Sequence, residues 1–157
     1  MAEGPTPRIV VAEADFDLGT EAGRLEDGPD TGAVVTFTGR VRDVPGDADA
    51  SLDHMLIEHY PGMTERALTD IARQAAERWP LSGVTIIHRH GRLAPGDRIM
   101  MVATASRHRD AAFDAAAFLM DYLKSRAPFW KKEVTADGAI WVDARETDEA
   151  ALDRWID

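Results

Sequence analysis

Lysine is confined to one stretch of this chain, "DYLKSRAPFWKKE" at residues 121–133. Lys124, Lys131 and Lys132 are the only lysines among 18 Lys and Arg residues. Arginine stays protonated in proteins, whereas lysine can lose its proton when it is partly buried. A chain that uses lysine only here indicates a site that needs an amine, either for proton transfer or as a nucleophile.

The helix expected over residues 107–127 positions the first of these amines. On a wheel of about 100° per residue, Lys124 falls within about 20° of Phe113. We take Phe113 as the centre of the buried stripe, which also contains Ala116, Ala117, Met120 and Leu123. We therefore expect Lys124 to be partly buried. The alternative is that Lys124 reaches solvent at the helix end and stabilises the helix dipole there.

The strand expected after this helix carries the other two lysines. Because side chains alternate along a strand, Lys131 shares a side with Phe129, and Lys132 shares the other side with Trp130. If Lys124 and Lys131 lie close together on an apolar floor, each amine lowers the pKa of the other. Such a pair suits a general base, an acid with a tuned pKa or a nucleophile.

Two further groups of cations lie elsewhere in the chain. The "RHR" segment (107–109) begins the same helix, where free backbone N–H groups favour an anion. Arg40 and Arg42, on either side of Val41, point the same way along a strand. In a chain of net charge −10 these groups suggest an anionic ligand, most simply a phosphate. The alternatives are a solvated helix start and surface ion pairs. We interpret "IIHRHGR" (86–92) as ordinary strand-end polarity.

Composition narrows the classes of protein. A pI of about 4.9 argues against nucleic acid as a partner. No apolar run approaches the roughly 20 residues that span a bilayer, and the first residues do not resemble a secretory signal. We therefore expect a cytoplasmic protein without a membrane segment. No cysteine is present, and the five histidines form no metal-binding motif. We expect no metal and no other cofactor, and any sulfur in the chemistry must come from another molecule.

The pattern of elements predicts one domain over residues 1–157, with residues 1–7 as a disordered tail. Strands are expected in 8–16, 31–43 and 51–60, helices over 61–80 and 107–127, and a loop at 44–50. "GVTIIHRHGRL" and "DRIMMVATAS" are expected to form a hairpin, as are "FWKKEVT" and "AIWVD". Short helices are expected within 21–30 and 146–157. Two main helices with hairpin-linked strands indicate an α+β fold with a mostly antiparallel sheet.

Five motifs, in order, resemble the large, catalytic subunit family of molybdopterin synthase, the MoaE family. They are "GAVVTFTGRVRD", "IEHYPGMTERAL", "HRHGRLAPGD", "SRHRDAAF" and "MDYLKSRAPFWKKE", and the resemblance extends from about residue 8 to 155. It implies an α/β-hammerhead-type fold and a sulfurtransferase that converts cyclic pyranopterin monophosphate to molybdopterin. It also implies a small ubiquitin-like partner, whose C-terminal Gly-Gly tail carries the sulfur as a thiocarboxylate. The assembly it implies is a homodimer within a heterotetramer.

The same resemblance implies roles for particular residues. Lys124 and Lys131 match the catalytic lysines of the family. The matching substrate-binding positions are Arg40, Val41, Arg42, His108, Arg109, Lys132 and Glu133. Arg145 matches a position near the site.

Two rival functions remain open at this point. Lys124 could form a Schiff base with a carbonyl group of a phosphorylated substrate. Alternatively, the chain could be a non-catalytic adaptor whose lysines only dock the carboxylate of a ubiquitin-like tail.

A second apolar strip of the 107–127 helix bears on assembly. It consists of Ala111, Ala115, Phe118 and Tyr122. We expect it to lie near a dimer interface, so that the RHR segment of one subunit completes the site of the other. The alternative is that a loop of the same chain covers this strip.

Overall fold

Two four-stranded sheets form the framework of the protein. The computed structural model describes residues 4–43, 51–142 and 146–156. The first sheet, sheet A, has the order β1-β4-β6-β2, and sheet B has the order β5-β3-β7-β8. The strands of sheet A are β1 (Arg8–Ala12), β4 (Leu81–Arg89), β6 (Arg98–Ser106) and β2 (Ala33–Arg40). Only the β1–β4 pair is parallel among the described strands, which confirms the predicted α+β class with mostly antiparallel pairing.

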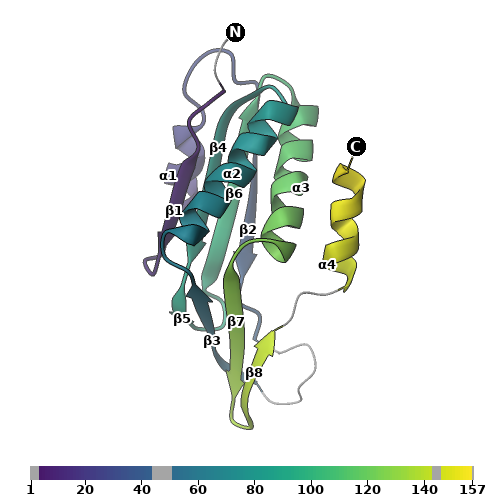
Figure 1. Ribbon diagram of the computed structural model, residues 1–157. Helices are drawn as coiled ribbons and strands as arrows, with labels where there is room; N and C mark the ends of the chain where they lie inside the picture. The colour runs from purple at the N-terminus through teal and green to yellow at the C-terminus, as the bar shows by residue number, and fades with distance from the viewer. Residues whose placement is uncertain (1–3, 44–50, 143–145, 157) are drawn as a thin grey trace.

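Helices cover both faces of sheet A. The two main helices, α2 (Met63–Arg78) and α3 (Arg109–Ser125), lie side by side on one face (Figure 1). Helix α1 (Leu18–Arg24) packs on the other face, where Leu18 contacts the small core around Ile87. Because side chains alternate along β4, the neighbouring Ile86 belongs to the main core beneath α2 and α3.

Sheet B extends past one end of sheet A (Figure 1). Its strands are β3 (Leu52–His59), β5 (Gly91–Leu93), β7 (Phe129–Thr135) and β8 (Gly138–Val142). The predicted antiparallel pairing of "GVTIIHRHGRL" with "DRIMMVATAS" is confirmed for β4 and β6, but the prediction that "GVTIIHRHGRL" forms one strand was wrong. The chain leaves sheet A at His90 and enters sheet B as β5, because Gly91 takes a positive φ of 88° that breaks the strand. The β7–β8 hairpin is confirmed.

The buried face of α3 matches the predicted stripe only in part. Phe113 is 60% exposed, and Lys124, which lies near it on the wheel, is exposed as well. The residues of α3 that are buried are Ala112, Ala115, Ala116, Phe118 and Leu119. Small alanines allow a helix to approach a sheet closely, so the core follows the alanines rather than the first large aromatic residue. The expectation that Lys124 is partly buried was therefore wrong.

The strip of α3 that was assigned to a dimer interface is covered by the same chain. Phe118 contacts Trp79 at the end of α2 and Trp155, with ring centroids 5.4 and 5.5 Å apart. Trp155 belongs to a 3₁₀ turn, Leu152–Trp155, which follows α4 (Glu146–Ala151) beside α3 (Figure 1). Asp121 of α3 accepts hydrogen bonds from Trp155 and from Arg154, which anchors this terminal segment. The argument for a dimer from this strip is thus removed.

Three predicted features lie wholly or partly outside the described residues, namely residues 1–3 of the N-terminal tail, the loop 44–50 and Arg145. No helix in the described part of the chain is long and apolar enough to cross a membrane.

Candidate active site

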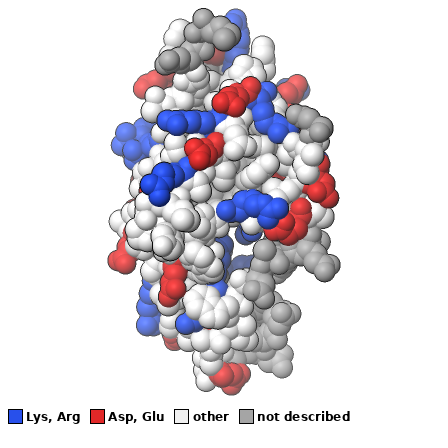
Figure 2. Space-filling model, viewed as in Figure 1, with Lys and Arg blue, Asp and Glu red and all other residues white. Residues whose placement is uncertain are grey.

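Lys124 and Lys131 lie on either side of the turn that joins α3 to β7. The turn is fixed by three hydrogen bonds. The Arg126 N–H donates to Tyr122 O (2.7 Å), the Phe129 N–H donates to Ala127 O (2.8 Å), and Thr64 Oγ1 donates to Pro128 O (3.3 Å). Lys124 is exposed in the last turn of α3, whereas Lys131 is partly buried and pairs with Ile57 and Val142. Figure 2 shows Lys or Arg atoms at a hollow below the lower end of α3. The two lysines, with the residues that contact this turn, are called the lysine site below.

A buried histidine lies beneath this turn. His88 is only 4% exposed, and its ring stacks on Phe129 with centroids 3.6 Å apart and planes 16° apart. The pKa of His88 is lowered to about 3, mainly by burial, and the charges of Lys131 and Lys124 contribute to this decrease. The charges of both lysines therefore act on the same imidazole.

Lys132 points away from that site. Its Nζ lies 4.4 Å from the ring centroid of Trp141, the residue of β8 that is paired with Lys132. Lys131 and Glu133 share the other side of β7 because side chains alternate. The structure thus brings the side chains of Lys131 and Glu133 to one side of the strand and places that of Lys132 on the other.

The segment Arg40–Arg42 is tied to the β5–β6 loop. The Arg40 guanidinium donates to Gly96 O at 3.1 and 3.3 Å, and the buried Val41 exchanges backbone hydrogen bonds with Asp97 and Gly96. Arg42 is exposed. Arg40 pairs with Arg98 at the start of β6, and α3 runs back over the sheet after β6. The two arginines therefore lie at the same end of sheet A as the lysine site (Figure 1).

His108 and Arg109 lie at the opposite end of α3. His108 precedes the helix and Arg109 is its first residue, and both side chains are exposed. At about 1.5 Å per residue, the helix separates Arg109 from Lys124 by roughly 22 Å. Within a single chain, the RHR segment therefore does not lie beside the lysines.

His88 is the site residue that sequence reasoning missed. It was interpreted as strand-end polarity, although strand alternation from Ile86 would have placed it on the side of the main core. The described residues contain no group of three or more His, Cys, Asp or Glu side chains that could hold a metal ion.

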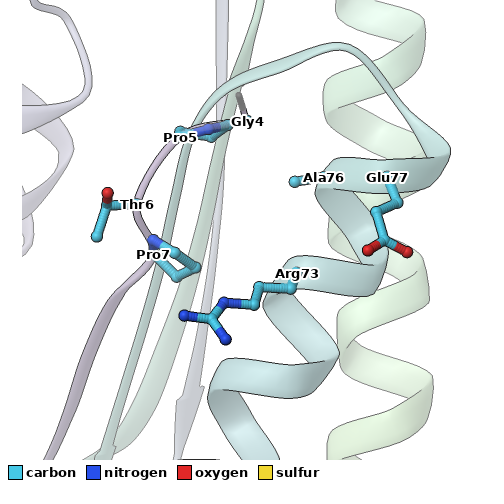
Figure 3. Close-up of a pocket in the computed structure, with 7 residues that line it drawn as sticks. All are labelled: Gly4, Pro5, Thr6, Pro7, Arg73, Ala76 and Glu77. Carbon is cyan, nitrogen blue, oxygen red and sulfur yellow. The ribbon is translucent and has the colours of Figure 1, made fainter. Parts of the chain in front are cut away.

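A separate groove of about 290 Å³ lies between the N-terminal segment and α2 (Figure 3). Gly4 to Pro7 line one side, and Arg73, Ala76 and Glu77 of α2 line the other. It contains none of the predicted site residues.

Comparison with known proteins places the chain in a family. The family model described as "MoaE protein" matches residues 11–126. The molybdopterin synthase catalytic subunit of Cereibacter sphaeroides is 61% identical over 94% of this chain and 99% of its own length. The protein of the same name from Escherichia coli is 51% identical over 94% of this chain and 97% of its own length.

A solved structure gives the same result. The molybdopterin biosynthesis MoaE protein from Burkholderia ambifaria superposes with a TM-score of 0.80 at 52% identity, covering 95% of this chain and 97% of that one. The similarities in sequence and in fold agree. The chain belongs to the MoaE family.

Proposed function

We propose that this chain is the catalytic subunit of a molybdopterin synthase. In this proposal the lysine site transfers sulfur from the thiocarboxylated C-terminal Gly-Gly tail of a small ubiquitin-like subunit to cyclic pyranopterin monophosphate, which forms the dithiolene of molybdopterin. The observation that carries the proposal is the pair of lysines on either side of one turn, in a chain of the MoaE family. Because the chain has no cysteine, a sulfur donor from outside agrees with its composition.

The described residues suggest how this chain would handle an anionic substrate. Arg42 and Lys124 are exposed cations at the same end of sheet A, and Lys131 lies on the same side of β7 as Glu133. Cations pair with phosphate or carboxylate groups through charge-assisted hydrogen bonds. A lysine amine can also give or take a proton, which arginine does not do at working pH.

The test is reconstitution of the purified chain with a thiocarboxylated small subunit and the pyranopterin precursor. Dithiolene formation is the measured product. Lys124→Ala and Lys131→Ala should each lower the rate by at least about 100-fold, the usual scale for loss of an acid or base group. Lys124→Arg and Lys131→Arg should also fail if an amine is needed. Arg73→Ala is the control, because Arg73 lines the separate groove on α2, which contains none of the predicted site residues, and it should stay within about threefold of the wild type.

The same experiment separates the rival functions. A wild-type chain that binds the thiocarboxylated subunit but forms no dithiolene in a single turnover would be an adaptor. A covalent adduct of Lys124 trapped by borohydride in the presence of precursor would indicate Schiff-base chemistry.

The positions of His108 and Arg109 support a shared site in a homodimer. They are roughly 22 Å from Lys124 along α3, so one chain cannot bring both ends of the helix to one small substrate. In the proposal, the RHR segment of one protomer reaches the lysine site of the other. The side of α3 that faces away from the core carries the exposed Phe113, and a large exposed apolar side chain suits contact with another chain.

A further inference from the structure

His88 connects the two sheets directly beneath the lysine site. Because side chains alternate along β4, His88 lies on the same side of sheet A as Ile86, which is the side covered by α2 and α3. His88 is the last β4 residue on that side. Its ring stacks on Phe129, the first residue of β7. In the chain, Phe129 lies between Lys124 and Lys131. The stack is therefore a contact between sheet A and the very turn on which both lysines depend.

Phe129 is held by contacts with both sheets. Within sheet B, β7 pairs Phe129 with His59 of β3 and Lys131 with Ile57. This pairing fixes the strand within sheet B, whereas the His88 ring holds its first residue against sheet A. Lys131 is two residues further on and faces the same way as Phe129. A shift of Phe129 would therefore also shift the Lys131 amine relative to Lys124.

The imidazole of His88 suits this position as a neutral ring. Its Nδ1–H donates to Arg89 O at 2.7 Å, which fixes both the tautomer and the ring plane. Burial, then the charges of Lys131 on β7, Lys124 on α3 and His59 on β3, lower its pKa to about 3. The ring is therefore uncharged at any pH near neutrality, and it can lie beneath the lysine site without being charged itself.

We infer that His88 is a positioning residue for the lysine site, which acts by stacking on Phe129 and thereby sets the place of Lys131 relative to Lys124. The inference rests on the proposed function for its kinetic test. It assigns His88 no proton transfer and no contact with substrate.

The kinetic test compares two substitutions of His88. His88→Phe keeps a flat, uncharged ring and should retain kcat within about threefold. His88→Leu keeps apolar bulk but removes the flat ring, and it should lower kcat about tenfold or more with KM little changed, since misplacement of a catalytic group by about 1 Å is costly. Ile87→Val is the matched control. It alters a buried residue of the same strand that faces α1, and it should leave kcat unchanged.

A second readout does not depend on activity. With only three lysines in the chain, lysine labelled with ¹³C at Cε gives three side-chain signals in an NMR spectrum. His88→Leu should shift the signals of Lys124 and Lys131 and leave that of Lys132, which lies against Trp141. His88→Phe should leave all three near their wild-type positions. If His88→Leu does not fold, Phe129→Leu removes the same stack from the other side and should give the same shifts.

Two outcomes would overturn the inference. One is a folded His88→Leu protein with wild-type kcat and unmoved lysine signals. The other is a His88→Phe protein as impaired as His88→Leu with an altered pH profile of kcat, which would make the imidazole a proton-transfer group. A wild-type chain without sulfur transfer would count against the proposed function, and the NMR comparison would still test the inference.

Discussion

Glu21 carries a charge in a buried position, and Arg8 is its principal partner. Arg8 Nε and Nη2 donate to the two carboxylate oxygens at 2.8 and 3.1 Å, which ties α1 to β1. The hydrogen bonds from Arg8 are the main cause that holds the pKa of Glu21 below its ordinary value of 4.5, against the opposing effect of burial. The pair therefore stabilises the fold only while Glu21 is ionised.

This linkage predicts how Glu21→Gln behaves with pH. A carboxyl group with a lowered pKa in the folded protein contributes stability above the unfolded value of 4.5, and loses it as the pH falls through the folded value. At pH 7, Glu21→Gln should lower the free energy of unfolding by about 1–2 kcal/mol, a modest effect because Arg8 is partly exposed. Below about pH 4 the difference from the wild type should shrink. Urea unfolding at pH 7, 5 and 3.5 measures this, with the exposed Glu26→Gln as control. A deficit that is the same at all three pH values would contradict the prediction.

At the residue scale, the environments of Lys124 and His88 were not predicted correctly from the sequence. The restriction of lysine to residues 121–133 located the turn that the structure places at the candidate site. The prediction that Lys124 is buried was wrong because the buried stripe was centred on Phe113. Only packing decides which side of a helix faces a sheet. His88 was missed because its environment comes from Phe129, which is distant in sequence. The roles of the substrate-binding residues remain predictions.

At the scale of elements, Gly91 is the point where one predicted strand becomes two. Its φ of 88° is in the left-handed region, and an added Cβ would lie 3.3 Å from Glu13 Oε1. Gly91→Ala should therefore lower the free energy of unfolding by about 1–2 kcal/mol. Gly91→Asn should cost less, since asparagine tolerates this conformation.

Gly23 supplies the matched control for Gly91. It lies in α1, where a Cβ would meet nothing within 4 Å. Gly23→Ala should raise the free energy of unfolding by about 0.5–1 kcal/mol, because alanine favours a helix. Thermal and urea unfolding of the variants test both glycines. Equal effects of alanine at the two positions would mean that the backbone at Gly91 is not what breaks the strand.

Local patterns predicted most of the elements. Helix α2 is an example, because its apolar residues recur at regular helical spacing. It begins after Gly62, and the Gly62 N–H donates to Glu65 Oε2 at 2.6 Å. It ends just before Pro80. The division into two sheets was not predicted, because β5 pairs with β3 across a long sequence separation. Such pairing depends on register between distant segments, and no local pattern specifies it.

At the scale of the whole molecule, the predicted site residues lie at the two opposite ends of α3. The lysine site is at one end and the RHR segment at the other, roughly 22 Å apart by the rise of the helix. A substrate the size of a pterin monophosphate cannot reach both ends in one chain. A two-fold dimer solves this if the RHR end of one protomer lies by the lysine end of the other, because a two-fold contact occurs twice.

Mixed dimers test this arrangement directly. A Lys124→Ala chain and an Arg109→Ala chain should each be impaired alone. If the site is shared, a mixed dimer has one site with both defects and one site with neither. Random mixing in equal amounts makes about half of the dimers mixed, so roughly a quarter of wild-type activity should return. Lys124→Ala mixed with Lys131→Ala is the matched control and should recover nothing, because both lysines come from the same protomer.

Dithiolene formation is the readout, and native mass spectrometry confirms subunit exchange. An Arg109 mixture as inactive as its parents, with exchange confirmed, would mean that each chain builds its site alone.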